Sequence, residues 1–275
     1  MAGKLTRRLG VIGTGRTGAA LVRGLITGGA IAPDKVIAND PDRAALDALA
    51  RETAIRTAPD NAALAAAADI ILIALKPEIV RPVLERLRAG LGPGHLLVSI
   101  AAGIPIRAIE EAAGGERRIV RVMPNACCLI GVGASAYAVS HRTTPEDAGD
   151  VRTILESVGL AVEVNEAQLD AVTGLSGSGP AYVAIVIEAL ADGGVRMGLA
   201  RADALRLAIQ TVAGAAQLLL ATGQHPAELK DAVTSPGGTT AAGLAALERA
   251  GVRAAFIDAV EAATRRATEL GQAKK

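Results

Sequence analysis

The sequence predicts an α/β fold in which a Rossmann-type, doubly wound parallel sheet is followed by an all-helical domain. In the first half of the chain, short β-branched runs alternate with Ala- and Leu-rich stretches. This is the pattern of parallel strands joined by crossover helices. After about Glu166 the strand-like runs stop and helical stretches take over. We therefore expect a doubly wound domain over residues 1–166 and a helical domain over residues 167–275.

Each strand of the first domain is expected from one β-branched run. Turn signals lie between the runs: Pro41-Asp42 and Lys76-Pro77-Glu78 are expected to open helices, and Gly92-Pro93-Gly94 is expected to end one. The expected strands are residues 9–12, 35–38, 70–75, 95–100 and 118–122.

The helical domain is expected to form the core of a homo-oligomer. Its first helix is apolar around most of its circumference, interrupted mainly by Glu188, Asp192 and Arg196, so it needs partners on several sides. Interleaved helices in a dimer, or in an assembly of dimers, would supply them. The expected helices are residues 180–198, 201–221, 226–232, 239–250 and 252–270.

Composition and charge argue against several classes of partner. With 29 basic and 28 acidic residues the net charge is +1, so no sustained positive field favours a nucleic acid. The longest uninterrupted apolar runs are far shorter than a membrane span. The basic start is followed by too few apolar residues for a secretory signal. A cytoplasmic protein with no nucleic-acid or membrane partner is expected.

The cysteines and histidines predict no metal site. Cys127 and Cys128 are adjacent, with neither a CxxC spacing nor nearby histidines, so buried, reduced thiols are the favoured interpretation. His95, His141 and His225 are far apart and lie in or after expected turns, so none is favoured as a catalytic base.

A dinucleotide-binding loop is predicted at residues 13–18, which read G-x-G-x-x-G between an expected strand and an expected helix. Gly13 permits the tight turn, Gly15 lets the backbone approach a pyrophosphate, and Gly18 lets the helix and the strand pack closely. The free amides at the helix start would face the anion.

The sequence leaves the choice of dinucleotide open. Asp40 follows the second expected strand, where a carboxylate binds the adenosine ribose and repels a 2′-phosphate, which favours NAD. Arg16, Arg43 and Asn39 stand against that interpretation. We expect NADP (NADPH), with NAD as the other possibility.

Two further glycine-rich segments are expected to be loops. Residues 170–182 are interpreted as a glycine-rich turn that runs into the long apolar helix. Residues 235–240, Ser-Pro-Gly-Gly-Thr-Thr, precede another expected helix, and unpaired amides there would form a nest for a carboxylate. From the residues alone, a well-capped helix is an equal alternative for the latter segment.

These segments, taken together, resemble the pyrroline-5-carboxylate reductase family over nearly the whole chain. The resemblance is carried by residues 170–182 and by residues 229–240. It extends to Ala74-Leu75-Lys76-Pro77 at the end of one expected strand and to residues 99–103, Ser-Ile-Ala-Ala-Gly, at the end of another. It implies NADPH-dependent reduction of 1-pyrroline-5-carboxylate, a cyclic imine, to L-proline, as the last step of proline biosynthesis.

The resemblance also implies roles for individual residues. The hydroxyl of Thr240 is expected to hydrogen-bond the ring nitrogen of the imine and to act in catalysis by positioning, and Asn61 is expected near the 2′-phosphate of NADP. The expected substrate-binding residues are Ser235, Gly237, Gly238, Thr239 and Thr240. The expected cofactor-binding residues are Ile12, Gly13, Thr14, Gly15, Arg16, Thr17, Gly18, Asn39, Asp40, Asn61, Ala74, Leu75, Lys76, Pro77, Ala101, Ala102, Gly103 and Asn125.

Departures from the family pattern occur at two places. The usual M-x-N-T-P run becomes Met-Pro-Asn-Ala-Cys over residues 123–127, and Ala232 stands where some members have Asn. The alternatives are therefore a reductase of another cyclic imine carboxylate and a catalytically idle NADP-binding regulator.

Membership of the β-hydroxyacid dehydrogenase family is disfavoured, because this chain lacks that family's lysine proton donor. That family shares the two-domain organisation and a G-x-x-G-x-G-x-x-x-K pattern, but here the last position is Val183. Ketone reduction needs a proton donor for the alkoxide. A protonated cyclic imine needs none, because hydride transfer neutralises the iminium.

Overall fold

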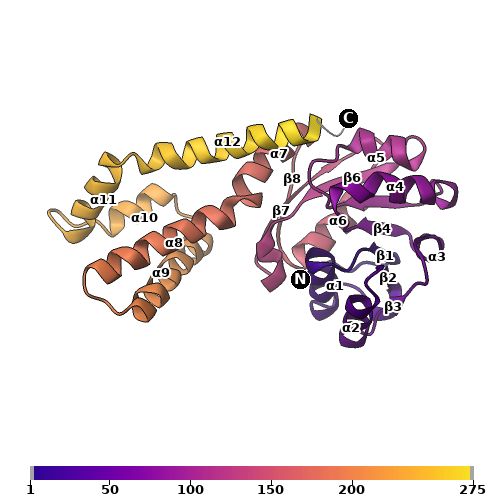
Figure 1. Ribbon diagram of the computed structural model, residues 1–275, viewed down its shortest axis with the longest axis horizontal. Helices are drawn as coiled ribbons and strands as arrows, with labels where there is room; N and C mark the ends of the chain where they lie inside the picture. The colour runs from indigo at the N-terminus through magenta and orange to yellow at the C-terminus, as the bar shows by residue number, and fades with distance from the viewer. Residues whose placement is uncertain (1–2, 273–275) are drawn as a thin grey trace. The chain divides into compact units, whose positions relative to one another are not determined.

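The computed structural model describes residues 3–272 and divides the chain into two compact units (Figure 1). The first unit contains Met1–Ser178 together with Ala262–Lys275, and the second contains Gly179–Glu261. This division by contacts falls later in the chain than the expected boundary after residue 166. That boundary remains a prediction.

The first unit contains an eight-stranded sheet in the order β3-β2-β1-β4-β5-β6-β7-β8. Its first six strands are parallel and have the 3-2-1-4-5-6 order of the doubly wound dinucleotide fold, which confirms the expected class. The strands are β1 (Leu9–Ile12), β2 (Val36–Asn39), β3 (Arg56–Thr57), β4 (Ile70–Ile73), β5 (Leu96–Ser99), β6 (Arg118–Met123), β7 (Gly133–Val139) and β8 (Gly159–Glu163).

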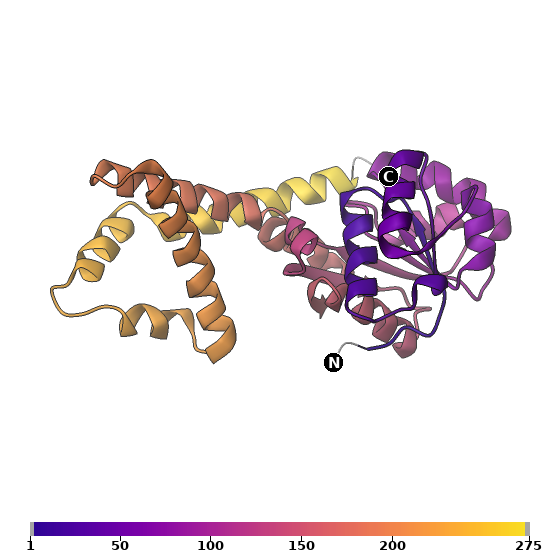
Figure 2. The same cartoon turned by 90° about the horizontal axis from the view of Figure 1, so that it is seen from below.

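Helices cover both faces of this sheet (Figures 1 and 2). Alternate strand residues point to opposite layers: Ile70 and Leu72 join the core beneath α1, α2 and α6, whereas Ile71 and Ile73 join the core beneath α3, α4 and α5. The helices are α1 (Arg16–Thr27), α2 (Arg43–Thr53), α3 (Asn61–Ala67), α4 (Pro77–Leu87), α5 (Ile106–Ala113) and α6 (Pro145–Glu156).

The second unit is helical, as expected. Its best-buried contacts are made by Ala191 of α8 with Ala204 and Ala208 of α9, where small side chains let the helices approach closely. Large apolar side chains such as Ile185 and Leu207 remain well exposed. The helices are α8 (Gly179–Arg196), α9 (Arg201–Thr222), α10 (Pro226–Ala232), α11 (Thr239–Arg249) and α12 (Val252–Gln272), the last of which ends in the first unit.

The expectation of a glycine-rich turn over residues 170–182 is wrong. The chain is helical there, passing from α7 (Leu169–Val172) through a π-helical segment, Thr173–Gly177, into α8. The backbone N–H of Ser178 donates to the carbonyl of Thr173 (2.9 Å). Because such N–H groups are satisfied within the helix, the segment does not offer the row of free amides that cradles an anion.

Two helical stretches are more apolar over their length than the short uninterrupted runs indicated. Among the described residues, two helical stretches, Glu166–Arg196 and Arg201–Thr222, are long and apolar enough by composition to cross a membrane. Only 11% of the most apolar part of each stretch is buried. Few charges interrupt them. The absence of a membrane partner therefore remains a prediction.

Candidate functional site

The carboxyl ends of six neighbouring strands, β1 to β6, bring the expected cofactor residues to one edge of the sheet. The strand register pairs Ile12 with Ile73 and Ile73 with Ser99, so the loops after β1, β4 and β5 start side by side. Hydrogen bonds continue the ladder into these loops: Ala74 N–H donates to Ile12 (2.9 Å) and Ile100 N–H to Ile73 (3.1 Å). Open α/β sheets bind ligands at this edge.

The glycine loop after β1 has room where a pyrophosphate would approach. A side chain at Gly18 would place its Cβ 2.3 Å from the Gly13 carbonyl oxygen, and Gly13 itself has a φ of +99°. Both positions therefore require glycine for backbone reasons. Gly15 differs, because a Cβ there would meet nothing within 4 Å. Gly15 is also the N-cap of α1 and provides no side-chain cap, so the helix amides are available to an anion.

Asp40 is bound to the glycine loop. Its Oδ2 accepts hydrogen bonds from the backbone N–H of Thr14 (2.6 Å) and from the Thr14 hydroxyl (3.2 Å). Its Oδ1 accepts from the backbone N–H of Asp42 (2.8 Å). The carboxylate thus supports the loop, and it places a negative charge at the edge where the adenosine ribose binds in this fold.

Asn39 and Asn61 form an amide pair beside Asp40. Asn39 Nδ2 donates to Asn61 Oδ1 (2.7 Å), and Asn39 Oδ1 is buried without a partner among the described residues. A buried acceptor of this kind favours a donor from a bound molecule. Arg43 is turned to the backbone instead, donating to the carbonyls of Ala58 and Pro59, whereas Arg16 is exposed at the start of α1.

Other residues expected at the cofactor site differ in exposure along the sheet edge. Lys76 and Ala102 are exposed, Ala74 and Gly103 are half-buried, and Ala101 is buried. Gly103 has a φ of +71°, which glycine adopts readily. The loop over residues 100–105 therefore turns sharply at the edge, with one exposed residue at its tip.

Asn125, after β6, has a structural task. Its Oδ1 accepts hydrogen bonds from the backbone N–H groups of Cys127 (3.2 Å) and Ala134 (3.1 Å), which leaves its Nδ2 for other partners. Burial raises the pKa of the neighbouring Cys128 thiol above its ordinary value. This thiol is therefore neutral near pH 7.

The expected substrate loop lies in the second unit and is described by itself. Gly238 N–H donates to the Ser235 carbonyl (3.0 Å), and Gly237 has a φ of +65°, a turn geometry that glycine favours. Gly238 is the N-cap of α11 and contributes no side-chain cap. Within residues 3–272, the half-buried Thr240 hydroxyl makes no hydrogen bond. The amides at the start of α11 and this hydroxyl are thus available to a small carboxylate ligand.

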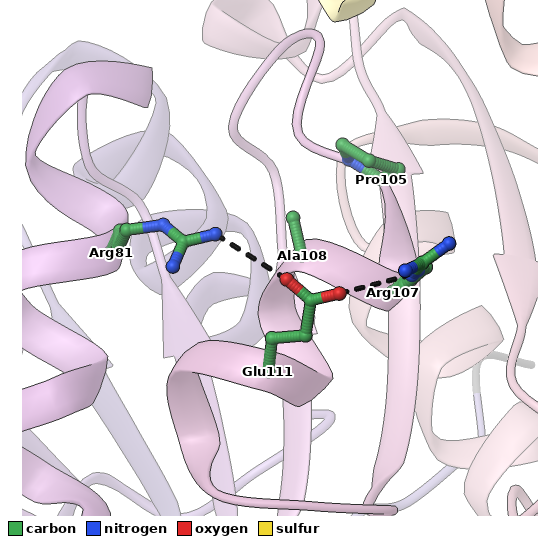
Figure 3. A pocket seen from close by; sticks show the side chains of 5 residues that line it. All are labelled: Arg81, Pro105, Arg107, Ala108 and Glu111. Carbon is green, nitrogen blue, oxygen red and sulfur yellow. Dashed lines mark hydrogen bonds and ion pairs between the residues drawn. The ribbon is translucent and has the colours of Figure 1, made fainter. Parts of the chain in front are cut away.

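A separate pocket of about 190 Å³ lies between α4 and α5 (Figure 3). Glu111 lies between two arginines there: Arg107 Nε is 2.9 Å and Arg81 is 3.6 Å from its carboxylate oxygens. All three side chains are about half exposed or more. Because the arginines already pair with Glu111, and none of the expected cofactor residues lines this pocket, it is no part of the candidate site.

The sequence interpretation missed a buried ionic cluster under the sheet edge. Arg121 of β6 is 8% exposed and pairs with Glu166 and Asp170. The sequence feature that could have revealed this cluster is an arginine inside a β-branched run. A charged residue in a buried strand is usually paired, so Arg121 predicts acidic partners. Its partners lie about 45 residues further along the chain, so only the fold identifies them.

The fold and the glycine loop define a dinucleotide-dependent oxidoreductase. Residues 8–103 match the family model described as NADP oxidoreductase, coenzyme F420-dependent, and residues 166–270 match the model for pyrroline-5-carboxylate reductase dimerisation. The chain belongs to the pyrroline-5-carboxylate reductase family.

Relatives cover almost the entire chain. A pyrroline-5-carboxylate reductase of Methanosarcina acetivorans is 46% identical over 97% of this chain and 98% of its own length. The solved pyrroline-5-carboxylate reductase of Coxiella burnetii is 35% identical, with a TM-score of 0.94 over 97% of this chain and 99% of that one. The Plasmodium falciparum enzyme, solved with NADP bound, is 35% identical, with a TM-score of 0.85 over 98% of this chain and all of that one.

Proposed function

We propose that this protein reduces 1-pyrroline-5-carboxylate to L-proline with NADPH, as the last step of proline biosynthesis. The observation that carries the proposal is the pair of loops, each at the uncapped start of a helix: the glycine loop before α1 and the Ser-Pro-Gly-Gly loop before α11. One suits a pyrophosphate and the other a small carboxylate. The family membership supports this pairing of ligands.

The residues of the first unit fit an NADP-type dinucleotide. The open space at Gly15 accommodates a pyrophosphate, and the buried, unpartnered Oδ1 of Asn39 offers an acceptor beside Asn61. The Asp40 charge works against a 2′-phosphate, so the ratio of NADPH to NADH use depends on this residue. When bound, the cofactor supplies a hydride from its nicotinamide ring.

The chain supplies binding and orientation more than proton transfer. Amides at the start of α11 would bind the substrate carboxylate, and the Thr240 hydroxyl would hydrogen-bond the ring nitrogen to orient the C=N carbon. Hydride addition to that carbon moves the π electrons onto the nitrogen and neutralises the iminium. Because the imine arrives protonated, no proton donor is required at this step. This agrees with the absence of a Lys at Val183.

We further propose a cytoplasmic homodimer, or an assembly of dimers, held by the second unit. The exposed apolar side chains of α8 and α9, including Ile185 at 65% and Leu207 at 58% exposure, exceed what a soluble monomer usually leaves in contact with water. The match of residues 166–270 to a dimerisation model supports the same conclusion.

Consumption of NADPH tests the function directly. The purified protein is expected to oxidise NADPH with pyrroline-5-carboxylate and to form proline in equal amount. A panel with six-membered cyclic imine carboxylates separates this reductase from one that acts on another ring size. If NADPH binds and no imine is reduced, the protein is the idle regulator instead.

A further inference from the structure

The loop over residues 100–105, at the carboxyl end of β5, is held at its start by strand pairing and at its end by a side chain outside it. At its start, Ser99 is paired with Arg121 of β6 in the sheet register. At its end, Ile106 begins α5, and the N-cap of this helix, Pro105, contributes no side-chain cap. The Ile106 N–H donates instead to Glu166 Oε1 at 2.7 Å. A glutamate 60 residues away in the chain therefore caps α5.

Arg121 orients this glutamate. Its guanidinium is 3.2 Å from the same Glu166 oxygen and 3.6 Å from Asp170 Oδ1. The Arg121 side chain is 10% exposed, and those of Glu166 and Asp170 are 35% and 27% exposed. A buried arginine needs paired acceptors, so Glu166 cannot rotate away without leaving this charge poorly paired.

The end of α12 reaches the same loop. Thr268 Oγ1 donates to Asp170 Oδ2 at 2.9 Å. Three residues on, the backbone of Gly271 lies against the loop, where a Cβ built on Gly271 would be 3.7 Å from the Gly103 carbonyl oxygen. Glu166, at the start of the dimerisation match over residues 166–270, thus bonds to the end of the loop. Gly271, just past the end of that match, lies against Gly103 within the loop.

We propose that Glu166, oriented by Arg121, is a positioning residue that holds loop 100–105 in the geometry needed for hydride transfer. This inference rests on the proposed function, because it takes residues 101–103, which the family resemblance assigns to the cofactor site, to lie beside the nicotinamide. A misplacement of about 1 Å can cost about a hundredfold in rate even when it arises away from the reacting atoms. Loss of the α5 cap is therefore expected to affect turnover more than cofactor affinity.

The test compares Glu166→Ala with Glu166→Gln. Alanine removes the cap and the partner of Arg121, whereas glutamine retains an oxygen that can accept from Ile106 N–H. We expect Glu166→Ala to lower kcat by about tenfold to a hundredfold while the Kd for NADPH changes by less than about threefold. Hydrogen exchange over residues 101–106 is expected to quicken. Glu166→Gln is expected to restore most of both properties.

Thr144→Ala is the matched control, because it removes the side-chain cap of α6 in the same unit, where Thr144 Oγ1 accepts from Asp147 N–H (3.2 Å). It should destabilise the protein to a similar extent and leave kcat and loop exchange unchanged. Normal kcat in Glu166→Ala, or an equal loss of kcat in Thr144→Ala, would overturn the proposal.

Thr268→Val tests the same cluster without removing a partner of the buried Arg121 charge. The Thr268 side chain is exposed, and the variant loses only its hydrogen bonds to Asp170 and to the Thr264 carbonyl. Faster exchange around Gly103 is expected, and unchanged exchange would remove α12 from the proposal. If the wild-type protein does not reduce pyrroline-5-carboxylate, the proposed function itself is wrong, and this outcome is distinct from a failure of the inference about Glu166. The exchange measurements would still decide whether Glu166 holds the loop.

Discussion

Asp40 accepts two hydrogen bonds from Thr14, one from the backbone N–H at 2.6 Å and one from the hydroxyl at 3.2 Å. The residue expected to bind the adenosine ribose is therefore also a support of the glycine loop. The same carboxylate cannot be removed without two consequences, one for cofactor choice and one for loop geometry. A substitution that separates them is needed to interpret either.

Asp40→Asn removes the charge and keeps an amide oxygen that can accept from Thr14, and of the hydrogen bonds it loses only the one from Asp42 N–H. We expect the ratio of kcat/KM for NADPH to kcat/KM for NADH to rise about tenfold, since the repulsion of a 2′-phosphate is worth about 1.4 kcal/mol at such a site. Asp40→Ser should shift the ratio in the same direction and lower kcat/KM for both cofactors. Asp42→Asn, at the exposed cap of α2, is the control, and an unchanged ratio in Asp40→Asn would show that Asp40 does not read the ribose.

Gly15→Val is expected to abolish NADPH binding without unfolding the protein. A Cβ at this position meets nothing within 4 Å in the chain, and the branched side chain would occupy the space for the pyrophosphate. Fluorescence titration with NADPH and a thermal melt measure the two properties. Gly149→Val, on the exposed face of α6 and equally free of contacts, should bind NADPH normally. Wild-type affinity in Gly15→Val would reject the site.

Gly18→Ala, unlike Gly15→Val, should destabilise the folded protein. Its Cβ would lie 2.3 Å from the Gly13 carbonyl oxygen, so α1 must shift from β1, and we expect a loss of about 1 to 3 kcal/mol in the free energy of unfolding. Urea denaturation measures it. A variant as stable as wild type would mean that helix and strand can separate at no cost.

Ile185→Arg is expected to yield monomers or aggregates. The side chain is 65% exposed in the single chain, and a partner that covers it would bury an unpaired charge in the variant. Sedimentation measures the assembly. Ile79→Arg, at an exposed isoleucine of α4 in the first unit, is the control with the same chemical change. If the Ile185 variant sediments like wild type, this face of α8 is not in the interface.

Thr240→Ala is expected to lower kcat by about tenfold to a thousandfold, the effect of losing one positioning hydrogen bond of roughly 1.5 to 4 kcal/mol in the transition state. The Kd for NADPH should stay within about threefold, since the glycine loop belongs to the other unit. Thr240→Ser retains the hydroxyl and should retain most activity. Full activity in the alanine variant would make Thr240 only a helix residue.

Asp69 predicts an acid-sensitive contribution to stability. Hydrogen bonds from Arg8, with distances of 2.8 Å to each carboxylate oxygen, lower the pKa of Asp69 to about 2. Because this folded-state pKa lies below the unfolded value of about 3.9, the stabilisation is complete above about pH 4 and is lost as the pH falls towards 2. The pair is partly exposed, so we expect about 1 kcal/mol at neutral pH.

Urea denaturation between pH 7 and pH 2 measures this contribution. Asp69→Asn should be less stable than wild type near pH 7, and the two proteins should converge at the acid end. Glu52→Gln, which breaks the exposed pair with Arg23, should change little. A constant difference between wild type and Asp69→Asn at all pH values would show that the charge of Asp69 does not contribute.

The sequence determined those features that depend on local periodicity and on backbone chemistry. Five strands of the sheet and the helices of the second unit occur where β-branched runs and apolar periodicity predicted them. The glycine loop could also be read, since Gly13 and Gly18 admit no side chain for reasons that lie within one strand, turn and helix.

Only the tertiary structure placed the elements with weak local signals. β7, with the sequence GASAYAV, and β8, with GLAVE, are rich in Ala and Gly, which have little strand preference. They become strands by pairing, β7 with β6 and β8 with β7. The glycines of residues 173–177 suggested a turn, but hydrogen bonding and packing hold that segment in a π-helix.

The family resemblance of the sequence likewise predicted individual residues for the cofactor site, whereas only the fold shows which hydrogen bonds their side chains make. Side-chain oxygens of Asp40 and Asn125 accept hydrogen bonds from backbone amides. Glu166 caps α5 from a distant segment. The partners of Asp40 and Glu166, Thr14 and Ile106, are separated from them by 26 and 60 residues, and such pairs leave no periodic pattern in the sequence. They arise from strand order and register, which bring carboxyl ends to one edge of the sheet, and this geometry is set only when the entire unit is folded.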